Sequence, residues 1–479
     1  MQEESGMSSQ HTDKTLIKWI DNFIDEQSFL PIGSEYIPDN KFHSLPGSEV
    51  ITGLAKVNQR PVAIYAHDSS VNRGYVTRQG ARKIIHLMDK AEKLRIPIVA
   101  FLASPGVSLE ENLLSGDEYT QIIARNIRLS GIIPQFAVIL APTLGAPAYS
   151  AVLMDLLFFN KHRSYLMVTS PTVVQQAIGE KVTMGELGSA TLHATTTGIA
   201  DFVDDSVTAQ INHVKAILGF FPLHTNERPP VHPIMEPNHP IPDIPANPRM
   251  PFNMLNLIQA VVDNSNVIQY KRTYGQAMIC AFVHIHGFAV GVVANQSIRY
   301  SGAIDSDAAQ KAAKFIRICD AYSIPILTFI DVPGFMPGKR EEQKGLLQHG
   351  ARFCVAMQTR VPRLSVIVRK CYGAAAFLMM QTKSQNGDLV LALETANLGV
   401  MGKETTNKVQ AMDGQPVQES SQSQLTEKSQ IDDSLMEAYS LGLIDEIIQA
   451  AQIRSRLASH LEFLYRRMET MPPAKHSIV

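Results

Sequence analysis

The chain is poor in cysteine, in tryptophan and in net charge. Four cysteines and one tryptophan occur among 479 residues, and the formal net charge is −2. With so little net charge, there is no electrostatic reason to expect nucleic acid or an acidic membrane surface as a partner. No two cysteines form a C-x-x-C pair, which argues against a zinc ribbon and predicts free thiols in a reducing cytoplasm. They are Cys280, Cys319, Cys354 and Cys371.

The chain also lacks segments that would direct it to a membrane. Its first residues, MQEESGMSSQHTDK, are polar and contain no apolar core of a signal peptide. No apolar run reaches the length of about 20 residues that a membrane-spanning helix needs. We therefore expect a cytoplasmic protein with no membrane partner.

A repeated pattern is the strongest feature of the sequence. Pro97 and Pro325 each begin an apolar run, and Gly145 and Gly373 each follow the next one. The members of each pair are 228 residues apart. The same spacing holds without a gap from residue 57 to residue 149. Such a register predicts two copies of one domain.

A proline-rich segment separates the two copies. Residues 222–251 contain ten prolines, whose fixed φ and missing N–H favour an extended connector. We therefore expect an N-terminal domain at 1–221 with a helical arm at 15–30, a linker at 222–252 and a C-terminal domain at 253–479.

Within each copy, the apolar spacing predicts helices that alternate with buried strands, a pattern typical of an α/β fold with a parallel sheet. Residues 405–432 are rich in Gln, Ser, Thr and Lys, and we expect a mobile surface segment there. The predicted helices are 79–95, 118–130, 149–158, 307–322, 341–358 and 445–471.

Two predicted strand-to-helix turns suggest the chemistry. Gly145 and Gly373 each stand between an apolar run and a predicted helix. A helix that begins at small residues leaves backbone N–H groups that a carbonyl oxygen can approach closely. This is how a backbone oxyanion hole is built, and such holes stabilise enolates and tetrahedral adducts. The glycines could instead be close-packing positions, but the shared spacing favours a paired functional use.

Several motifs together resemble one protein family. They include DVPGFMPG from Asp331, VIVRKCYGAAAF from Val366, and GEKVTMGELGSATLH, which ends at His193. With these motifs the chain resembles the carboxyltransferase β-subunit of biotin-dependent acyl-CoA carboxylases. Supporting matches, such as VVANQ at 292–296, extend the resemblance over nearly the whole chain.

The resemblance implies a crotonase-like α/β fold made of two tandem β-β-α spiral domains. It implies transfer of a carboxyl group from carboxybiotin to the α-carbon of an acyl thioester, with acyl-CoA as substrate, through enolates held in two oxyanion holes. It also implies a biotin carboxylase and biotin carboxyl carrier partner, and a homo-oligomer that is a dimer or a trimer of dimers. No lysine stands in an Ala-Met-Lys-Met setting, so biotin is expected on the partner.

By position, the resemblance places one hole at Gly145 and Ala146 and the other at Gly373, Ala374 and Ala375. Beyond the two holes, a further group of residues is expected to contact the substrate. Among them, Phe377 takes the position that lines the acyl pocket in the family. These residues are Phe377, Tyr149, Ser104, Gly106, Gly334 and Phe335.

The chain departs from the family pattern mainly in its first copy. The family has a Gly-Gly-Ser-Leu-Gly loop where this chain has Arg73-Gly74-Tyr75-Val76-Thr77. Pro147 follows the first hole, where it removes an amide donor. Phe377 would also make the acyl pocket smaller. We therefore expect a short or unusual acyl group, carried on CoA or on a carrier protein.

Other polar residues are expected to have structural roles. Asp331 is predicted to form a turn or cap rather than to act as a catalytic acid. His193 is predicted to be a structural hydrogen-bonding residue. His286 and His349 have no partners at ligand spacing, so no metal site is predicted.

The basic pair Arg369-Lys370 and the neighbouring Cys371 have open interpretations. The pair could meet a phosphate or a carboxylate, and a solvated surface pair is an equal alternative. Cys371 lies beside the second turn, but no histidine on a predicted helix is near in sequence, so packing is favoured over a catalytic thiol.

Three functions fit these features. The first is a biotin-dependent carboxyltransferase. The second is a biotin-independent decarboxylase of a malonyl-type thioester, which biotin dependence would separate from the first. The third is a non-catalytic subunit that binds an active homologue, which co-purification with that homologue and no turnover by the isolated chain would favour.

Overall fold

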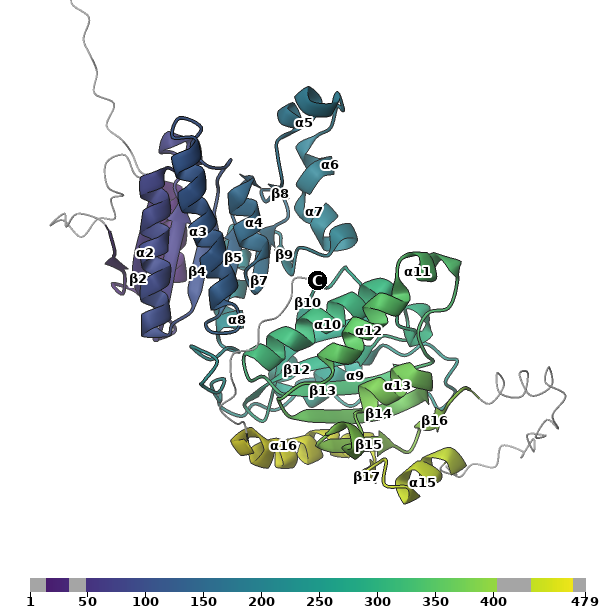
Figure 1. The fold of residues 1–479 in the computed structure, drawn as a ribbon. Helices are drawn as coiled ribbons and strands as arrows, with labels where there is room; N and C mark the ends of the chain where they lie inside the picture. The colour runs from purple at the N-terminus through teal and green to yellow at the C-terminus, as the bar shows by residue number, and fades with distance from the viewer. Residues whose placement is uncertain (1–13, 34–48, 403–431, 468–479) are drawn as a thin grey trace, which may run out of the picture. The chain divides into compact units, whose positions relative to one another are not determined.

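The computed structural model describes residues 14–33, 49–402 and 432–467 (Figure 1). The surface segment expected at 405–432 lies outside these residues, except for its last position. The chain divides into two compact units, and the first ends at Glu227, within the proline-rich stretch. Among the described helices, none combines the length and the apolar character that a membrane crossing requires.

The first unit is built on a seven-stranded sheet with the strand order β1-β2-β3-β4-β5-β7-β9. Its elements in chain order are α1 (Lys14–Phe23), β1 (Leu30–Pro31), β2 (Val50–Val57), β3 (Arg60–His67), η1 (Asn72–Gly74), α2 (Arg78–Leu94), β4 (Ile98–Leu102), α3 (Leu113–Leu129), β5 (Gln135–Ile139), β6 (Thr143–Leu144), α4 (Ala146–Val152), β7 (Leu156–Asn160), β8 (Leu166–Met167), α5 (Pro171–Ile178), α6 (Met184–Gly188), α7 (Ala190–Leu192), the π-helix η2 (His193–Thr197), β9 (Phe202–Asp204) and α8 (Val207–Leu218).

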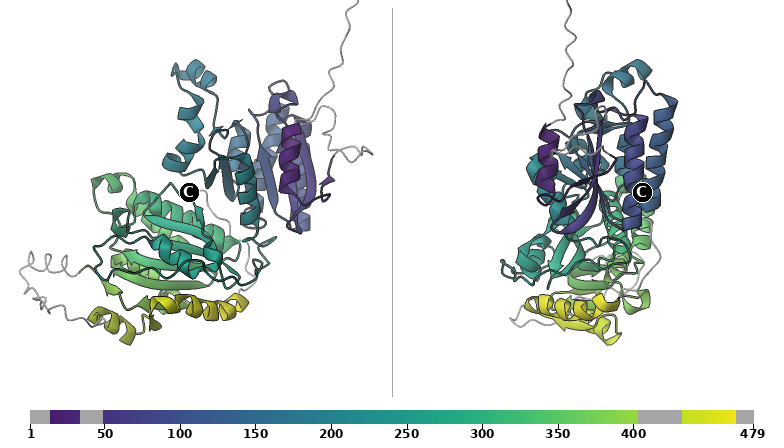
Figure 2. Two further views of the ribbon diagram at one scale, coloured as in Figure 1. Left: turned by 180° about the vertical axis from the view of Figure 1, so that it is seen from behind. Right: turned by 90° about the vertical axis from the view of Figure 1, so that its left-hand side faces the viewer.

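Most of this sheet is parallel. Strands β2 and β3 form an antiparallel hairpin, and β3, β4, β5, β7 and β9 then run parallel to one another. Helices α2 and α3 cover one face and α1 lies on the other (Figure 2). Every residue of β4 and β5 is buried. Such continuous apolar strands are expected where helices cover both faces of a parallel sheet.

The second unit has an eight-stranded sheet with the order β10-β11-β12-β13-β14-β15-β17, and β16 pairs with the end of β14. Its elements in chain order are α9 (Met254–Val261), η3 (Asp263–Ser265), β10 (Ile268–Tyr270), β11 (Met278–Ile285), β12 (Phe288–Asn295), η4 (Tyr300–Gly302), α10 (Ser306–Ala321), β13 (Ile326–Val332), α11 (Lys339–Gln343), α12 (Leu346–Ala356), β14 (Arg363–Tyr372), α13 (Gly373–Met380), η5 (Lys383–Gln385), β15 (Leu389–Leu393), β16 (Asn397–Gly399), α15 (Asp433–Ser440), β17 (Glu446–Ile448), η6 (Ala450–Gln452), α16 (Ile453–Leu464) and η7 (Tyr465–Arg467).

Helices also cover both faces of this second sheet. Helices α9 and α16 share a buried apolar core with alternate residues of β11, β12, β13 and β14. Helices α10 and α12 pack together on the other face (Figure 1). There Phe315 of α10 meets Phe282 of β11, with 4.9 Å between the ring centroids.

The strand registers confirm the repeat that the sequence predicts. In the first unit, β3 and β4 pair Ala63 with Ile98. In the second unit, β12 and β13 pair Gly291 with Ile326, which lie 228 residues further on. The next strand pairs, β4–β5 and β13–β14, keep the same spacing.

The repeat extends to the backbone of two matched loops and to a matched buried lysine. Residues 72–74 have φ values of 47°, 53° and 78°, and residues 300–302 have 49°, 55° and 87°. Lys83 and Lys311, on α2 and α10, are both buried and donate to the first carbonyl oxygen of β2 and of β11, respectively. The two copies therefore share loop conformation and a buried lysine contact at matched positions.

Two predicted helices are wrong in part. The helix expected at 149–158 ends at Val152, because Leu156 begins β7 and this strand pairs with β5. The helix expected at 341–358 is two helices, α11 and α12, separated at Gly345 with a φ of 81°. In both places tertiary pairing or a glycine turn interrupts an apolar pattern that is compatible with a continuous helix.

The predicted end of the chain and its N-terminal arm are also corrected. The helix expected at 445–471 begins only at Ile453, because residues before it form β17 at the edge of the sheet. The arm expected at 15–30 is helical as far as Phe23. The helices predicted at 79–95, 118–130 and 307–322 are confirmed as α2, α3 and α10, respectively.

Candidate active site

The second strand-to-helix turn joins β14 to α13. Strands β13 and β14 stay paired as far as Val332 and Cys371, so Gly334 and Gly373 each lie two residues beyond the last pair. Gly373 has a φ of 68°, which residues with a side chain rarely adopt. A Cβ added there would meet only the Val400 carbonyl oxygen, at 3.5 Å. Glycine is therefore required by the backbone conformation rather than by lack of space.

The first turn of α13 presents amide donors. The first N–H groups of a helix have no acceptor within that helix, and the side chain of the N-cap residue Tyr372 makes no capping hydrogen bond. Among the backbone hydrogen bonds of the described residues, none uses the N–H of Ala374 or Ala375. An oxygen with developing negative charge can bind such adjacent donors, and the helix dipole adds to the attraction.

The first strand-to-helix turn has a glycine with a similar φ but fewer donors. Gly145 has φ 63° and ψ −135°, and its N–H is already bonded to the Val168 carbonyl oxygen at 3.1 Å. Pro147 has no N–H, and the N–H of Ala148 is bonded to the Gly145 carbonyl oxygen at 3.0 Å. Among the described backbone hydrogen bonds, Ala146 is left as the one amide of this turn without an acceptor.

Each turn carries an exposed aromatic residue one helical turn further on. Tyr149 is 54% exposed and Phe377 is 36% exposed. Each lies four residues after the glycine of its turn, so the two aromatics occupy matched positions of the repeat. Residues four apart lie on the same face of a helix. These side chains are therefore placed beside the amides of their own turns.

The loop after β4 supports the first turn. The Ser104 hydroxyl is buried, donates to the Gly74 carbonyl oxygen at 2.7 Å and accepts from the Gly106 N–H at 3.2 Å. The Leu144 N–H, next to Gly145, donates to the Ser104 carbonyl oxygen at 2.9 Å. Ser104 and Gly106 thus lie next to the turn, with the serine hydroxyl engaged within the loop.

The loop after β13 has the same relation to the second turn. The Ile304 N–H donates to the Gly334 carbonyl oxygen at 3.1 Å, and the matched bond in the first unit is 2.9 Å. Phe335 is half-buried, and its ring is 3.4 Å from the place of a Cβ added at Gly350 on α12. The expected contacts of Gly334 and Phe335 with a substrate stay predictions.

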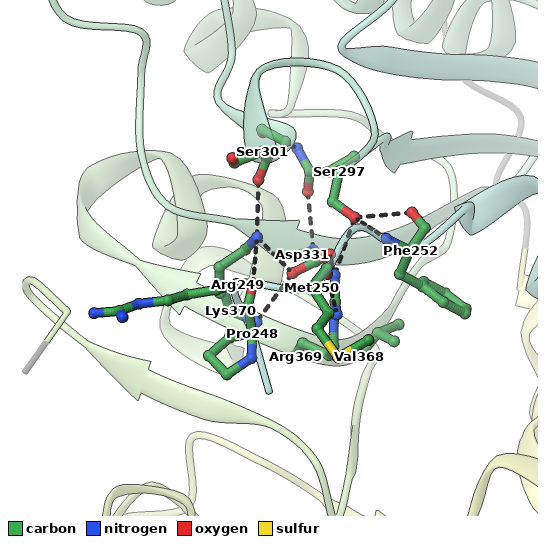
Figure 3. Close-up of polar contacts among 12 residues, drawn as sticks. Pro248, Arg249, Met250, Phe252, Ser297, Ser301, Asp331, Val368, Arg369 and Lys370 are labelled. Atoms are coloured by element: carbon green, nitrogen blue, oxygen red, sulfur yellow. Dashed lines mark hydrogen bonds and ion pairs between the residues drawn. The ribbon is translucent and has the colours of Figure 1, made fainter. Parts of the chain in front are cut away.

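A buried ion cluster behind the second turn was not predicted (Figure 3). Arg369 Nη2 lies 2.6 Å from Asp331 Oδ2, and Lys370 Nζ lies 3.4 Å from Asp331 Oδ1. The side chains of Asp331, Arg369 and Lys370 are 0%, 1% and 8% exposed. The interpretation of Arg369-Lys370 as a solvated surface pair is therefore wrong, since their carboxylate partner is Asp331. Burial lowers the pKa of Lys370, although the nearby carboxylate opposes this shift.

Two residues have the structural roles that the sequence suggests. His193 Nε2 is 2.7 Å from the Leu166 carbonyl oxygen, and its Nδ1 is 2.8 Å from Thr197 Oγ1. Cys371 is buried, and burial raises the pKa of its thiol to about 12. Because a thiol with this pKa stays protonated at neutral pH, Cys371 is a packing residue and not a nucleophile.

Comparisons with known proteins agree with one another. The chain matches the family described as "Carboxyl transferase domain" over residues 9–479. It is 32% identical to the "Propionyl-CoA carboxylase, carboxyltransferase subunit" of Haloferax mediterranei, over 99% of this chain and 95% of the relative. It is 34% identical to "Methylmalonyl-CoA decarboxylase subunit alpha" of Propionigenium modestum, over 90% of this chain and 85% of the relative.

A solved structure has the same architecture. The transcarboxylase 12S structure, described as a hexamer with methylmalonyl-coenzyme A and methylmalonic acid bound, superposes with a TM-score of 0.85 at 28% identity. The match covers 96% of this chain and 91% of that one. The predicted crotonase-like α/β fold is confirmed.

Proposed function

Because the chain belongs to the carboxyl transferase domain family, we propose that it transfers a carboxyl group to and from the α-carbon of an acyl-CoA. The observation that carries the proposal is the pair of matched strand-to-helix turns at Gly145 and Gly373, each beginning a helix with an amide N–H that has no acceptor among the described backbone hydrogen bonds. The decarboxylase and non-catalytic alternatives are not favoured by the comparisons.

The role proposed for the second turn follows from the charge that the reaction creates. When the α-carbon of an acyl thioester loses a proton and gains a carboxyl group, negative charge gathers briefly on the thioester oxygen. The N–H groups of Ala374 and Ala375 would donate to that oxygen. A preorganised donor of this kind contributes about 10²- to 10³-fold to a rate, and correct positioning of the reactants contributes further.

The first turn is proposed to stabilise the second oxyanion of the reaction. Carboxybiotin, held by a separate carrier protein, would supply the carboxyl group and would itself need a hydrogen-bond donor for its ring carbonyl oxygen. The Ala146 N–H is the donor that this turn offers. Tyr149 and Phe377, exposed beside their turns, would line the two binding sites and restrict their size.

Further features of the function are proposals by analogy with the relatives. We propose a short-chain acyl-CoA as substrate, because Phe377 adds bulk at the position that lines the acyl pocket in the family. We propose a biotin carboxylase and biotin carboxyl carrier partner and a homo-oligomeric assembly, as the transcarboxylase 12S structure is described as a hexamer. A cytoplasmic location stays a prediction.

Carboxyl loss from malonyl-CoA and methylmalonyl-CoA by the purified chain, with and without free biotin, tests the proposal. Turnover that requires biotin is expected, because biotin is then the acceptor of the carboxyl group in the reverse direction. Turnover that is independent of biotin would favour a decarboxylase. No turnover with either thioester would contradict the proposal and favour a non-catalytic subunit.

A further inference from the structure

The buried ion cluster behind the second turn is absent from the first copy. Asp331, Arg369 and Lys370 lie in strands β13 and β14 immediately before their turns. The residues 228 positions earlier are all uncharged: Ala103, Ala141 and Pro142. The two copies share strand register as far as Ile330 and a positive φ at the turn glycines, so the cluster distinguishes the second turn from the first.

The cluster occupies an irregularity in the strand pairing. Ile330 pairs with Ile367 and Val332 pairs with Cys371, so one residue of β13 lies opposite three residues of β14. Asp331 is that one residue, and its Oδ1 accepts the backbone N–H of Lys370 at 3.3 Å. The carboxylate thus takes the place of a missing backbone acceptor in the bulge.

Arg369 joins this bulge to the end of the proline-rich segment. Its Nη1 donates to the Met250 carbonyl oxygen at 2.9 Å, and its Nη2 donates to Ser297 Oγ at 3.0 Å. The Ser297 hydroxyl in turn accepts the Phe252 N–H at 3.0 Å and donates to the Phe252 carbonyl oxygen at 2.8 Å (Figure 3). The guanidinium group also lies over the Phe252 ring, 5.4 Å from its centroid.

Lys370 joins the bulge to a second loop. Its Nζ donates to the Ser301 carbonyl oxygen at 2.9 Å and to the Pro248 carbonyl oxygen at 3.3 Å. Ser301 lies in η4, the turn with three positive φ values that precedes α10. Two residues after Lys370 the strand ends, and Gly373 begins α13.

The strand that carries the cluster is continuous, whereas its counterpart is broken. Strand β14 runs without interruption from Arg363 to Tyr372. In the first copy, β5 ends at Ile139 and β6 begins only at Thr143. The charged contacts therefore accompany a strand that is continuous up to the amides that follow.

We propose that Asp331, Arg369 and Lys370 are positioning residues that hold the Gly373 turn at the geometry needed for carboxyl transfer. The inference rests on the function proposed for that turn. The three side chains are buried, so they do not contact the substrate themselves. They hold the end of β14, the end of the proline-rich segment and the η4 loop together. A displacement of about 1 Å at the reacting groups costs on the order of 100-fold in rate.

The test uses a variant in which the central ion pair is neutral, Asp331→Asn with Arg369→Met. The matched control is Asp89→Asn with Arg125→Met, which neutralises an ion pair with 2.7 Å between Arg125 Nε and Asp89 Oδ1, on helices α2 and α3. With methylmalonyl-CoA and free biotin, the positioning role predicts a kcat lowered by about 10- to 100-fold with KM unchanged. The control variant is expected to keep both values.

Amide hydrogen exchange of residues 372–380 gives a readout that does not depend on activity. Exchange is expected to be faster in the Asp331→Asn/Arg369→Met protein than in wild type and in the control. If the wild-type protein shows no turnover, the proposed function is contradicted. The exchange comparison would still test the positioning role in that case. A folded variant with unchanged exchange in this segment overturns the inference, as does unchanged kcat in an active enzyme.

Ser297→Ala decides the question if the double variant does not fold. It removes the hydroxyl between Arg369 and Phe252 but keeps all three charges. We expect faster exchange at residues 372–380 and a smaller loss of kcat than in the double variant, again with KM unchanged. Wild-type values for both measurements overturn the inference.

Discussion

The two strand-to-helix turns of this chain have glycines with similar φ values in two different chemical settings. Gly145 and Gly373 have φ values of 63° and 68°, and the strands before them are paired in the same register. Within the described part of the chain, the second turn begins with two alanine amides that have no backbone acceptor, and a buried ion cluster lies behind it. The first turn has one such amide, followed by Pro147, and no charged residues at the matched positions.

This difference shows which parts of the repeat are set by conformation and which by chemistry. Positive φ values recur at matched glycines because the chain must turn sharply from strand to helix in both copies. The number of donors and the support behind them are free to differ. We therefore expect the second turn to contribute more to transition-state stabilisation than the first.

The largest effect is expected from breaking the buried cluster. Asp331→Asn leaves Arg369 and Lys370 buried without their carboxylate, which costs about 3–5 kcal/mol of stability. Asp89→Asn, in an ion pair at the surface of the first unit, should cost less than about 1 kcal/mol. Urea unfolding of the two variants measures the comparison, and equal losses would contradict the importance of the cluster.

The next effect concerns the turns themselves. Gly373→Ala places a side chain at a φ of 68°, so the backbone must change and the amides of Ala374 and Ala375 move. We expect kcat for biotin-dependent carboxyl loss to fall by about 10²- to 10³-fold. Gly145→Ala should have a smaller effect because fewer donors move. Circular dichroism would check that both variants fold, and a larger loss at Gly145 would reverse the comparison.

A third difference between the copies is visible in the dependence on pH. His67 and Asn295 hold matched positions and accept the N–H of Ala103 and of Asp331, respectively. Burial lowers the pKa of His67 from 6.5 to about 4. The unfolded chain therefore binds a proton as the pH falls below 6.5, which the folded chain resists until about pH 4.

The free energy of unfolding should thus fall between pH 6.5 and about 4. At pH 5 the part of this loss that is due to His67 is about 2 kcal/mol. The substitution His67→Asn copies the second unit and should remove this part of the loss. Urea unfolding at pH 7 and pH 5 provides the measurement. A variant that is as sensitive to acid as the wild type would show that His67 is not responsible.

The smallest effect is a gain. Pro147→Ala gives the first turn the residue that the second turn has at Ala375 and adds one amide N–H. A hydrogen bond from this group is worth about 1 kcal/mol, which corresponds to a roughly fivefold rise in kcat. Steady-state kinetics with methylmalonyl-CoA and biotin would detect it. An unchanged or lower kcat would mean that the first turn is not limited by its donors.

Much of the fold could be predicted from the sequence because local residue patterns determine it. Prolines and glycines at a constant spacing of 228 residues encode the strand starts and the sharp turns of both copies. Those residues constrain φ directly, so their spacing survives when the side chains differ. The motifs from Asp331 and Val366 then give the family.

The parts that could not be predicted depend on tertiary contacts. Residues 156–159, LLFF, are apolar throughout and have no alternation that distinguishes a strand from a buried helix. The ion cluster depends on a bulge that places Asp331 opposite Arg369 and Lys370, and no local pattern reveals that pairing. A carboxylate in the penultimate position of a strand that ends before a Pro-Gly turn, with two adjacent cations in the next strand, is the signal that could have suggested the cluster.

The central claim is tested most directly by following the carboxyl group itself. The purified chain would be given malonyl-CoA with a radiocarbon-labelled carboxyl group, unlabelled propionyl-CoA as acceptor, and free biotin. The account predicts labelled methylmalonyl-CoA that forms only when biotin is present, and much less of it with Gly373→Ala. Label that is lost from malonyl-CoA without biotin and never reaches propionyl-CoA would contradict carboxyl transfer.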